Sequence, residues 1–212
     1  MKIYDEEGYI DSDVHEILYE LGNVGIGMAS VTVGNMIGLR MNVGVPSIVP
    51  AKEIMKKETM NKKRKAGILM AFQRSMEGSM LFLLDEEFVN EVIEITCESG
   101  SVKAEEMDEA DKLSVLEEFA NITSAAYLKA VGQYTGMRLF VKPVWMKFEC
   151  IDRLLDEVTD RMEKNFSKAV CVDASYSIVY EDGNKKEDVG HVIMLPDEKS
   201  VEALVGPLMD EM

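Results

Sequence analysis

Two stretches of the chain place apolar residues on one side of a helix and polar residues on the other. The polar positions are Glu16, Glu20 and Asn23 in the first stretch, and Ser114, Glu118 and Asn121 in the second. Both sets are spaced i, i+4 and i+7, which places them within about 60° of one another on a helix. The opposite side carries Val14, Ile17, Leu21, Val24 and Met28 in the first stretch, and Val115, Phe119, Ile122 and Ala126 in the second. Each stretch is therefore predicted to be a helix with a narrow polar stripe and a buried apolar side.

The two stretches are copies of one pattern, because Glu20 and Glu118 are 98 residues apart, and so are Asn23 and Asn121. The same separation relates further identical pairs, namely Val33/Val131, Gly34/Gly132, Gly38/Gly136 and Arg40/Arg138. Each helix is predicted to end near its second glycine, where a left-handed C-cap forms easily. Glycines in the middle of the first helix, Gly22, Gly25 and Gly27, either let a partner's backbone come close or allow tight packing against a sheet.

Strand-like segments follow each helix. They cover 41–50, 67–73 and 78–85 in the first half, and 139–150, 169–180 and 190–197 in the second, where an acidic helical segment follows 139–150. The last strand repeats at a separation of 112, since Gly78 corresponds to Gly190 and Asp85 to Asp197. In both copies an Asp-Glu pair opens a short amphipathic helix, as an N-cap with first-turn negative charge does.

Each half is therefore helix, three strands, helix, which predicts the α+β class. The two halves are expected to pair their strands into one continuous sheet, with the two long helices packed on it and related by a pseudo-twofold axis. We predict a single domain over 1–212, with halves of about 1–100 and 104–212 and a polar boundary near 99–108. Separate domains are not expected, because three strands and two helices alone bury little surface.

Composition narrows the class of protein. The net charge of −16 disfavours nucleic acid and anionic membranes as partners. No apolar run approaches the ~20 residues of a membrane span, and the acidic N-terminus is unlike a signal peptide, so the protein is predicted to be cytoplasmic. The basic segment 56–65 is either a solvated loop or a patch that meets an acidic partner.

Cysteine and histidine do not indicate a metal site. Cys97, Cys150 and Cys171 are odd in number and widely spaced, so they are expected to be buried, reduced thiols, neither paired in disulfides nor bound to zinc. His15 and His191 lie far apart in the sequence and have no carboxylate motif beside them. No metal or other cofactor of the protein's own is therefore predicted.

The duplicated stripe resembles the CheC/CheX/FliY family of bacterial chemotaxis phosphatases. The family signature is Asp or Ser, three residues, Glu, two residues, Asn, then 22 residues and Pro; here Pro46 follows Asn23 after 22 residues, and Pro143 follows Asn121 after 21. Glu16 departs from the family's Asp or Ser, and the early Pro143 predicts a small deletion in the second helix-to-strand connection. The resemblance covers the whole chain, and CheC gives the nearest match, because both Glu/Asn pairs are kept and the chain ends soon after its second repeat.

The resemblance implies hydrolysis of the aspartyl-phosphate on a CheY-type response regulator. It implies that Asn23 and Asn121 orient the attacking water, since an amide can accept from water and donate to it without adding charge beside an anionic phosphoryl group. Glu20 and Glu118 would pair with the regulator's lysine, and Glu16 and Ser114 would make auxiliary contacts. The divalent metal of the reaction belongs to the regulator.

Other functions stay open at the level of the sequence. The chain could be an adaptor that binds the phosphorylated regulator without hydrolysis, or it could regulate the receptor deamidase CheD. A third alternative is a component of the flagellar switch. The lack of a further domain argues against this alternative. Both Glu/Asn pairs being present favours the enzyme, and the internal duplication, which already supplies two sites, favours a monomer.

Overall fold

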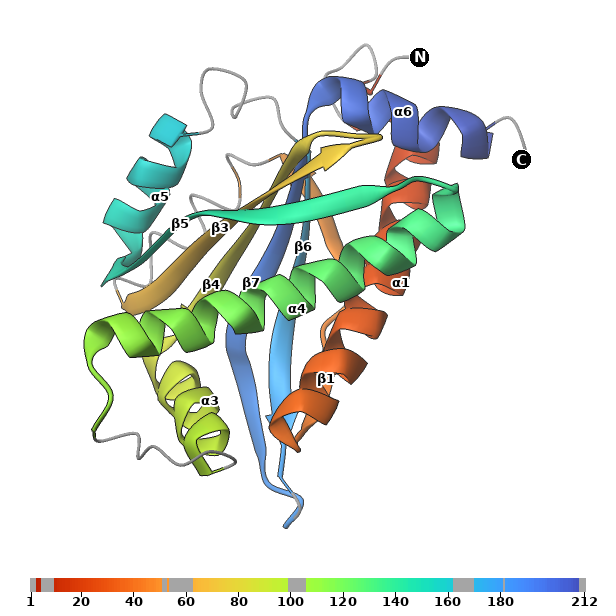
Figure 1. The fold of residues 1–212 in the computed structure, drawn as a ribbon. Helices are drawn as coiled ribbons and strands as arrows, with labels where there is room; N and C mark the ends of the chain where they lie inside the picture. The colour runs from red at the N-terminus through yellow and green to blue at the C-terminus, as the bar shows by residue number, and fades with distance from the viewer. Residues whose placement is uncertain are drawn as a thin grey trace.

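The computed structural model describes residues 3–4, 10–50, 53, 63–98, 106–161, 170–180 and 182–209. Its helices are α1 (Ser12–Ile37), α3 (Glu86–Glu98), α4 (Glu109–Thr135), α5 (Ile151–Arg161) and α6 (Glu198–Met209). Its strands are β1 (Arg40–Val43), β2 (Ser47–Pro50), β3 (Arg64–Arg74), β4 (Gly78–Asp85), β5 (Leu139–Cys150), β6 (Val170–Val179) and β7 (Lys185–Pro196). The predicted α+β class and the predicted continuous sheet are confirmed, with seven described strands in one antiparallel sheet (Figure 1).

The two halves of the chain exchange their first strands. The strand order is β1-β6-β7-β4-β3-β5, and β2 lies beside β1 as a second partner of β6. The first strands of the N-terminal half, β1 and β2, therefore pair with the second strand of the C-terminal half, and β5 pairs in the same way with β3. The last strands of the two halves, β4 and β7, meet in the centre.

The centre of the sheet carries the predicted pseudo-twofold axis. Leu81 of β4 pairs with Ile193 of β7, and these two residues are 112 apart, the separation that relates Gly78 to Gly190. A residue that pairs with its own repeat counterpart must lie beside the local symmetry axis. The long helices α1 and α4 are exchanged by the same axis, which places both of them on one face of the sheet (Figure 1).

The predicted deletion near Pro143 is wrong. Before the prolines, Val43 pairs with Tyr176 and its counterpart Val141 with Phe72; after them, Ser47 pairs with Asp173 and its counterpart Trp145 with Leu69. Val43 and Val141 are 98 residues apart, and so are Ser47 and Trp145, so the second half has lost no residue between these positions. The two prolines occupy neighbouring positions in the same irregular stretch, which breaks β1 from β2 and shifts the register of β5 against β3. A bulge has room for an extra residue, so proline is tolerated at either position.

Two apolar cores lie on the two faces of the sheet. The larger core packs α1, α3, α4 and α6 against one face, with Leu18, Leu21, Phe88, Phe119 and Val131 among its buried members. The smaller core packs α5 against the other face through Ile151, Leu155 and Val158. Within the described part of the chain, no helix is long and apolar enough to cross a membrane.

Most of the basic segment 56–65 and of the predicted boundary 99–108 lies outside the described residues. At the described end of the basic segment, Lys63 and Arg64 are exposed, whereas Lys65 is buried. Lys65 lies in β3 with only 2% of its surface exposed, and its Nζ is 3.1 Å from Oδ1 of Asp85. Its charge is therefore used inside the fold.

Candidate functional site

The helices α1 and α4 begin and end by the same local chemistry. Asp11 caps α1, accepting hydrogen bonds from the N–H groups of Asp13 and Val14, and Asp108 caps α4, accepting from the N–H of Asp111. At the other end, Gly38 and Gly136 take left-handed conformations with φ of 67° and 70°, which glycine adopts without the cost of a side chain. The predicted helix ends are confirmed.

A second pair of glycines explains the repeated G-x-x-x-G. A Cβ at Gly34 would lie 2.7 Å from the carbonyl oxygen of Leu39, and one at Gly132 would lie 2.5 Å from that of Met137. Leu39 N–H donates to the carbonyl of Gly34, which folds the chain back on the helix end. These glycines therefore let the chain turn from each helix into the strand that follows it, and contact with a partner is not needed to explain them.

The six predicted site residues lie on the outward side of α1 and α4. Glu16, Glu20, Ser114 and Glu118 are exposed, whereas Asn23 and Asn121 are half-buried. The half-burial restricts each amide to fewer rotamers than a fully exposed side chain has, while it leaves part of the group open to solvent. The same arrangement is present in both halves.

The carboxylates and amides of the two stripes have no hydrogen-bond or ion-pair partner among the described residues. Glu20, Asn23, Glu118 and Asn121 are thus available to an external group. Ser114 differs, because its hydroxyl donates to the carbonyl of Ala110 at 3.1 Å and keeps only acceptor capacity for another molecule.

The glycines of α1 have different roles. A Cβ at Gly22 would lie 2.6 Å from Val172 and 3.2 Å from Pro46, and Gly25 packs against the ring of Tyr127 on α4. Both therefore allow tight packing inside the protein, against the sheet and against the second long helix. A Cβ at Gly27 would meet nothing within 4 Å, so only this glycine keeps open space on the outward side.

The predicted apolar side of α1 is partly wrong. Val14, Ile17 and Leu21 are buried as expected, but Met28 is 46% exposed. Beyond the contact with α4, the buried side of α1 rotates to Ile26, Ala29, Ser30, Val33 and Ile37. Because α1 packs on different neighbours before and after this contact, a single helical face does not describe its whole length.

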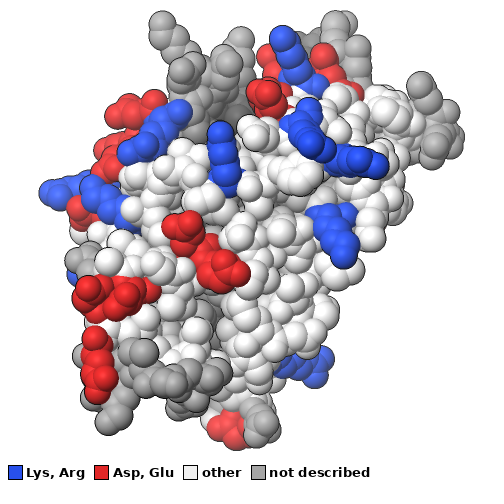
Figure 2. Space-filling view, in the orientation of Figure 1, with Lys and Arg blue, Asp and Glu red and all other residues white. Residues whose placement is uncertain are grey.

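The two stripes lie on helices that pack against each other where Gly25 meets Tyr127. Asn23 is two residues before Gly25, and Asn121 is six residues before Tyr127. At about 1.5 Å of rise per residue and about 8–10 Å between packed helix axes, the two amides lie within about 20 Å of each other. Figure 2, in which α4 crosses the front of the molecule, shows acidic side chains on the left and in the middle of this view and several Lys and Arg side chains over its upper part.

The opposite face of the sheet holds a polar pair that the sequence did not reveal. His191 Nδ1 is 2.9 Å from Asp173 Oδ1, and both side chains are buried. His191 therefore does have a carboxylate partner, contrary to the prediction, because β6 and β7 bring together residues 18 positions apart. Among the described residues, no group of three or more His, Cys, Asp or Glu side chains is placed to hold a metal ion.

The cysteines are free thiols, as predicted, but Cys97 and Cys150 are half-buried, where buried thiols were predicted. Cys171 is buried, and this burial, together with the nearby negative charge of Asp173, raises the pKa of its thiol well above the usual value. A protonated, buried thiol is a poor nucleophile. Cys171 therefore contributes packing and no chemistry to the stripes on the other face.

Comparison with known proteins finds relatives by sequence and by structure. No protein-family model matches the chain. The CheY-P phosphatase CheC of Bacillus subtilis (strain 168) is 23% identical over 202 residues, which are 92% of this chain and 93% of CheC. The crystal structure of Thermotoga maritima FliY has a TM-score of 0.69 at 18% identity, covering 96% of this chain and 99% of that one. FliM, in the FliM–SpeE complex from H. pylori, has a TM-score of 0.66 at 6% identity, covering 95% and 97%.

The fold, the repeated stripe and these similarities together confirm the resemblance of this chain to one class of protein, the CheC/CheX/FliY family. FliY and FliM share the fold of this chain, and the sequence of CheC matches it over almost the whole length.

Proposed function

We propose that the protein is a phosphatase that hydrolyses the aspartyl-phosphate of a CheY-type response regulator in bacterial chemotaxis. The observation that carries the proposal is the duplicated Glu-x-x-Asn stripe, exposed on two helices and unpartnered among the described residues. The similarity to CheC, which is named for this activity, supports it.

The amides of Asn23 and Asn121 suit the chemical step. Water attacks phosphorus, the bond between phosphorus and the regulator's carboxylate oxygen breaks, and inorganic phosphate leaves. An amide can hold the water in line with the breaking bond, because its oxygen accepts a hydrogen bond and its NH2 donates one. A carboxylate at this position would repel the phosphoryl group. The half-burial of both amides supports this role, since a positioning group must itself be held.

The carboxylates of Glu20 and Glu118 suit docking. Each lies one helical turn before its asparagine, is exposed, and forms no ion pair within the described part of the chain. An ion pair with the regulator's lysine would hold the helix in register over the phosphorylated aspartate. Glu16 and Ser114, a further turn away, would contact the edge of the regulator.

The decay of a phosphorylated CheY-type regulator, followed with and without this protein, tests the proposal. Faster decay is expected with the wild-type protein, and decay at the regulator's own rate with the Asn23→Ala/Asn121→Ala double variant. Asn35→Ala and Asn90→Ala are matched controls, because both remove an exposed helical amide outside the two stripes.

Binding separates the proposal from its alternative. Glu20→Lys and Glu118→Lys should weaken binding, since like charge would then face the regulator's lysine, whereas the asparagine variants should retain it. Unchanged decay with binding intact would favour the alternative, in which the protein is an adaptor that binds the regulator without hydrolysis or that regulates the deamidase CheD. Loss of binding in the asparagine variants would contradict the water-orienting role.

A further inference from the structure

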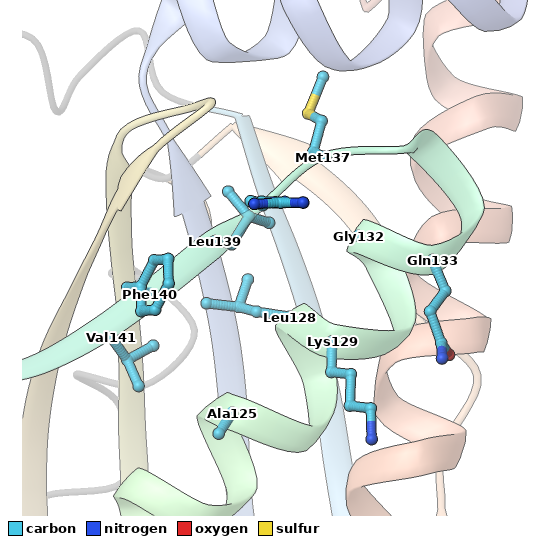
Figure 3. A pocket seen from close by; sticks show the side chains of 10 residues that line it. Ala125, Leu128, Lys129, Gly132, Gln133, Met137, Leu139, Phe140 and Val141 are labelled. Atoms are coloured by element: carbon cyan, nitrogen blue, oxygen red, sulfur yellow. The ribbon is translucent and has the colours of Figure 1, made fainter.

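A groove with a basic rim lies beside the second stripe. It has a volume of about 450 Å³ and runs between the C-terminal half of α4 and the start of β5. Its apolar lining comes from Leu128 on α4 and from Met137, Leu139, Phe140 and Val141. Figure 3 shows Leu128 reaching from α4 into the space, β5 forming the other wall, and Lys129 and Gln133 at the outer side of α4.

The charge of the groove is opposite to that of the protein. The net charge is −16, yet the charged residues of the groove are Lys129 and Arg138, with no acidic residue in the lining. Arg74 adds a third cation, its guanidinium carbon lying 4.4 Å above the ring of Phe140. Within the described residues, none of these three cations pairs with a carboxylate, whereas Lys65, Lys147 and Arg153 each do.

One wall of the groove is the edge of the sheet. Among the described strands, β5 pairs only with β3, so its other edge offers backbone N–H and C=O groups to a further strand. Three consecutive residues, Leu139, Phe140 and Val141, line the groove. The groove therefore follows the start of β5 along the strand. Phe140 is 52% exposed there.

The counterpart of the groove in the first half is different. The repeat places Val31 where the second half has Lys129, and Val31 is 60% exposed. Met28 and Met36 are also exposed along that part of α1. Arg138 has an arginine counterpart in the first half, Arg40, so only the cation at Lys129 is a property of the second half alone.

We propose that this groove binds an extended, acidic segment of a protein partner, with an apolar side chain of the segment between α4 and β5 and its carboxylates on Lys129 and Arg138. An extended segment fits, because it can pair with the free edge of β5 while alternate side chains enter the groove. A short segment is favoured over a membrane or nucleic acid, because a large polyanion would also meet the acidic surface around the groove. The proposal does not rest on the phosphatase activity.

The test uses the full chain and a fluorescent peptide in which Asp and Glu alternate with Leu and Phe. Fluorescence anisotropy should show binding to the wild-type protein, and Lys129→Glu/Arg138→Glu should weaken it by about tenfold or more. Lys112→Glu is the matched control on the same helix, about 25 Å away at 1.5 Å per residue, and should leave binding unchanged. Hydrogen exchange should slow at residues 139–141 when the peptide binds.

Three results would overturn the proposal. The first is no binding of the acidic peptide, or equal binding by the wild-type protein and the double charge reversal. The second is equal binding of a peptide with Lys in place of Asp and Glu. The third is concentration-dependent self-association that Phe140→Glu abolishes, which would make the groove an interface between two copies of the chain.

Discussion

Gly25 of α1 lies under the ring of Tyr127 of α4, where a Cβ would be 2.7 Å from Cζ of the ring. Tyr127 is only 2% exposed and cannot swing away into solvent. This contact fixes how close the two long helices come, and therefore how close the two polar stripes are to each other.

Gly25→Ala should destabilise the protein, because the added methyl group forces the two helices apart. We expect a loss of about 1–3 kcal/mol in the free energy of unfolding, as for other overpacked sites. Gly27→Ala is the control two residues away, where the added methyl group has open space and should stabilise the helix by about 0.5–1 kcal/mol. Urea unfolding at neutral pH measures both, and equal effects would contradict the packing argument.

The second stripe should be at least as active as the first. Ser114 fits the family signature at its leading position and Glu16 does not. We expect Asn121→Ala to lower the rate of regulator dephosphorylation by about twofold or more, and Asn23→Ala to lower it by about twofold or less, because two sites contribute to the measured rate. Rates at saturating regulator measure the step itself. A larger loss from Asn23→Ala would reverse the ranking.

Stability should fall in alkaline solution because of two buried tyrosines. Burial raises the pKa of Tyr127 and of Tyr176 above the ordinary value of about 10. The unfolded chain therefore releases these protons near pH 10 while the folded protein retains them. The contribution of each tyrosine to the free energy of unfolding is therefore fully present below about pH 10. Above that pH the free energy of unfolding falls by up to about 1.4 kcal/mol per pH unit for each tyrosine.

Tyr127→Phe isolates one of these groups. The hydroxyl of Tyr127 has no hydrogen-bond partner in the described structure, so its removal should stabilise the protein by about 1 kcal/mol at neutral pH. It should also make the alkaline loss shallower. Urea unfolding at neutral pH and at about pH 11 measures both effects; Tyr134→Phe, whose side chain is 57% exposed, is the control. A destabilised Tyr127→Phe at neutral pH would mean that the hydroxyl is satisfied.

Local features of the fold could be predicted from the sequence, because they depend on nearby residues. The helix ends at Gly38 and Gly136 follow from the backbone freedom of glycine, and the outward stripes follow from helical spacing. The exchange of first strands between the halves could not be predicted, because strand pairing depends on contacts far apart in the chain. The pairing of His191 with Asp173 was missed for the same reason.

Other differences show where a local rule does not hold along a whole element. Met28 fits the apolar side of α1 by its spacing, but the helix changes neighbours after Gly25, so Met28 is exposed. Pro143 suggested a deletion by its spacing, but a bulge accepts proline at either of two positions. No local sequence pattern indicates the basic groove, because α4 and β5 each contribute only some of its lining residues.

The pairing of Leu81 with Ile193 has a consequence for how such a chain can change over generations. Every strand contact of one half has its counterpart in the other, so two identical half-length chains could assemble the same sheet around this axis. In such a pair of identical chains, every mutation in a stripe would change both stripes at once. Joining the halves in one chain removes that restriction, and the contrast between Val31 and Lys129 shows that the copies have already diverged.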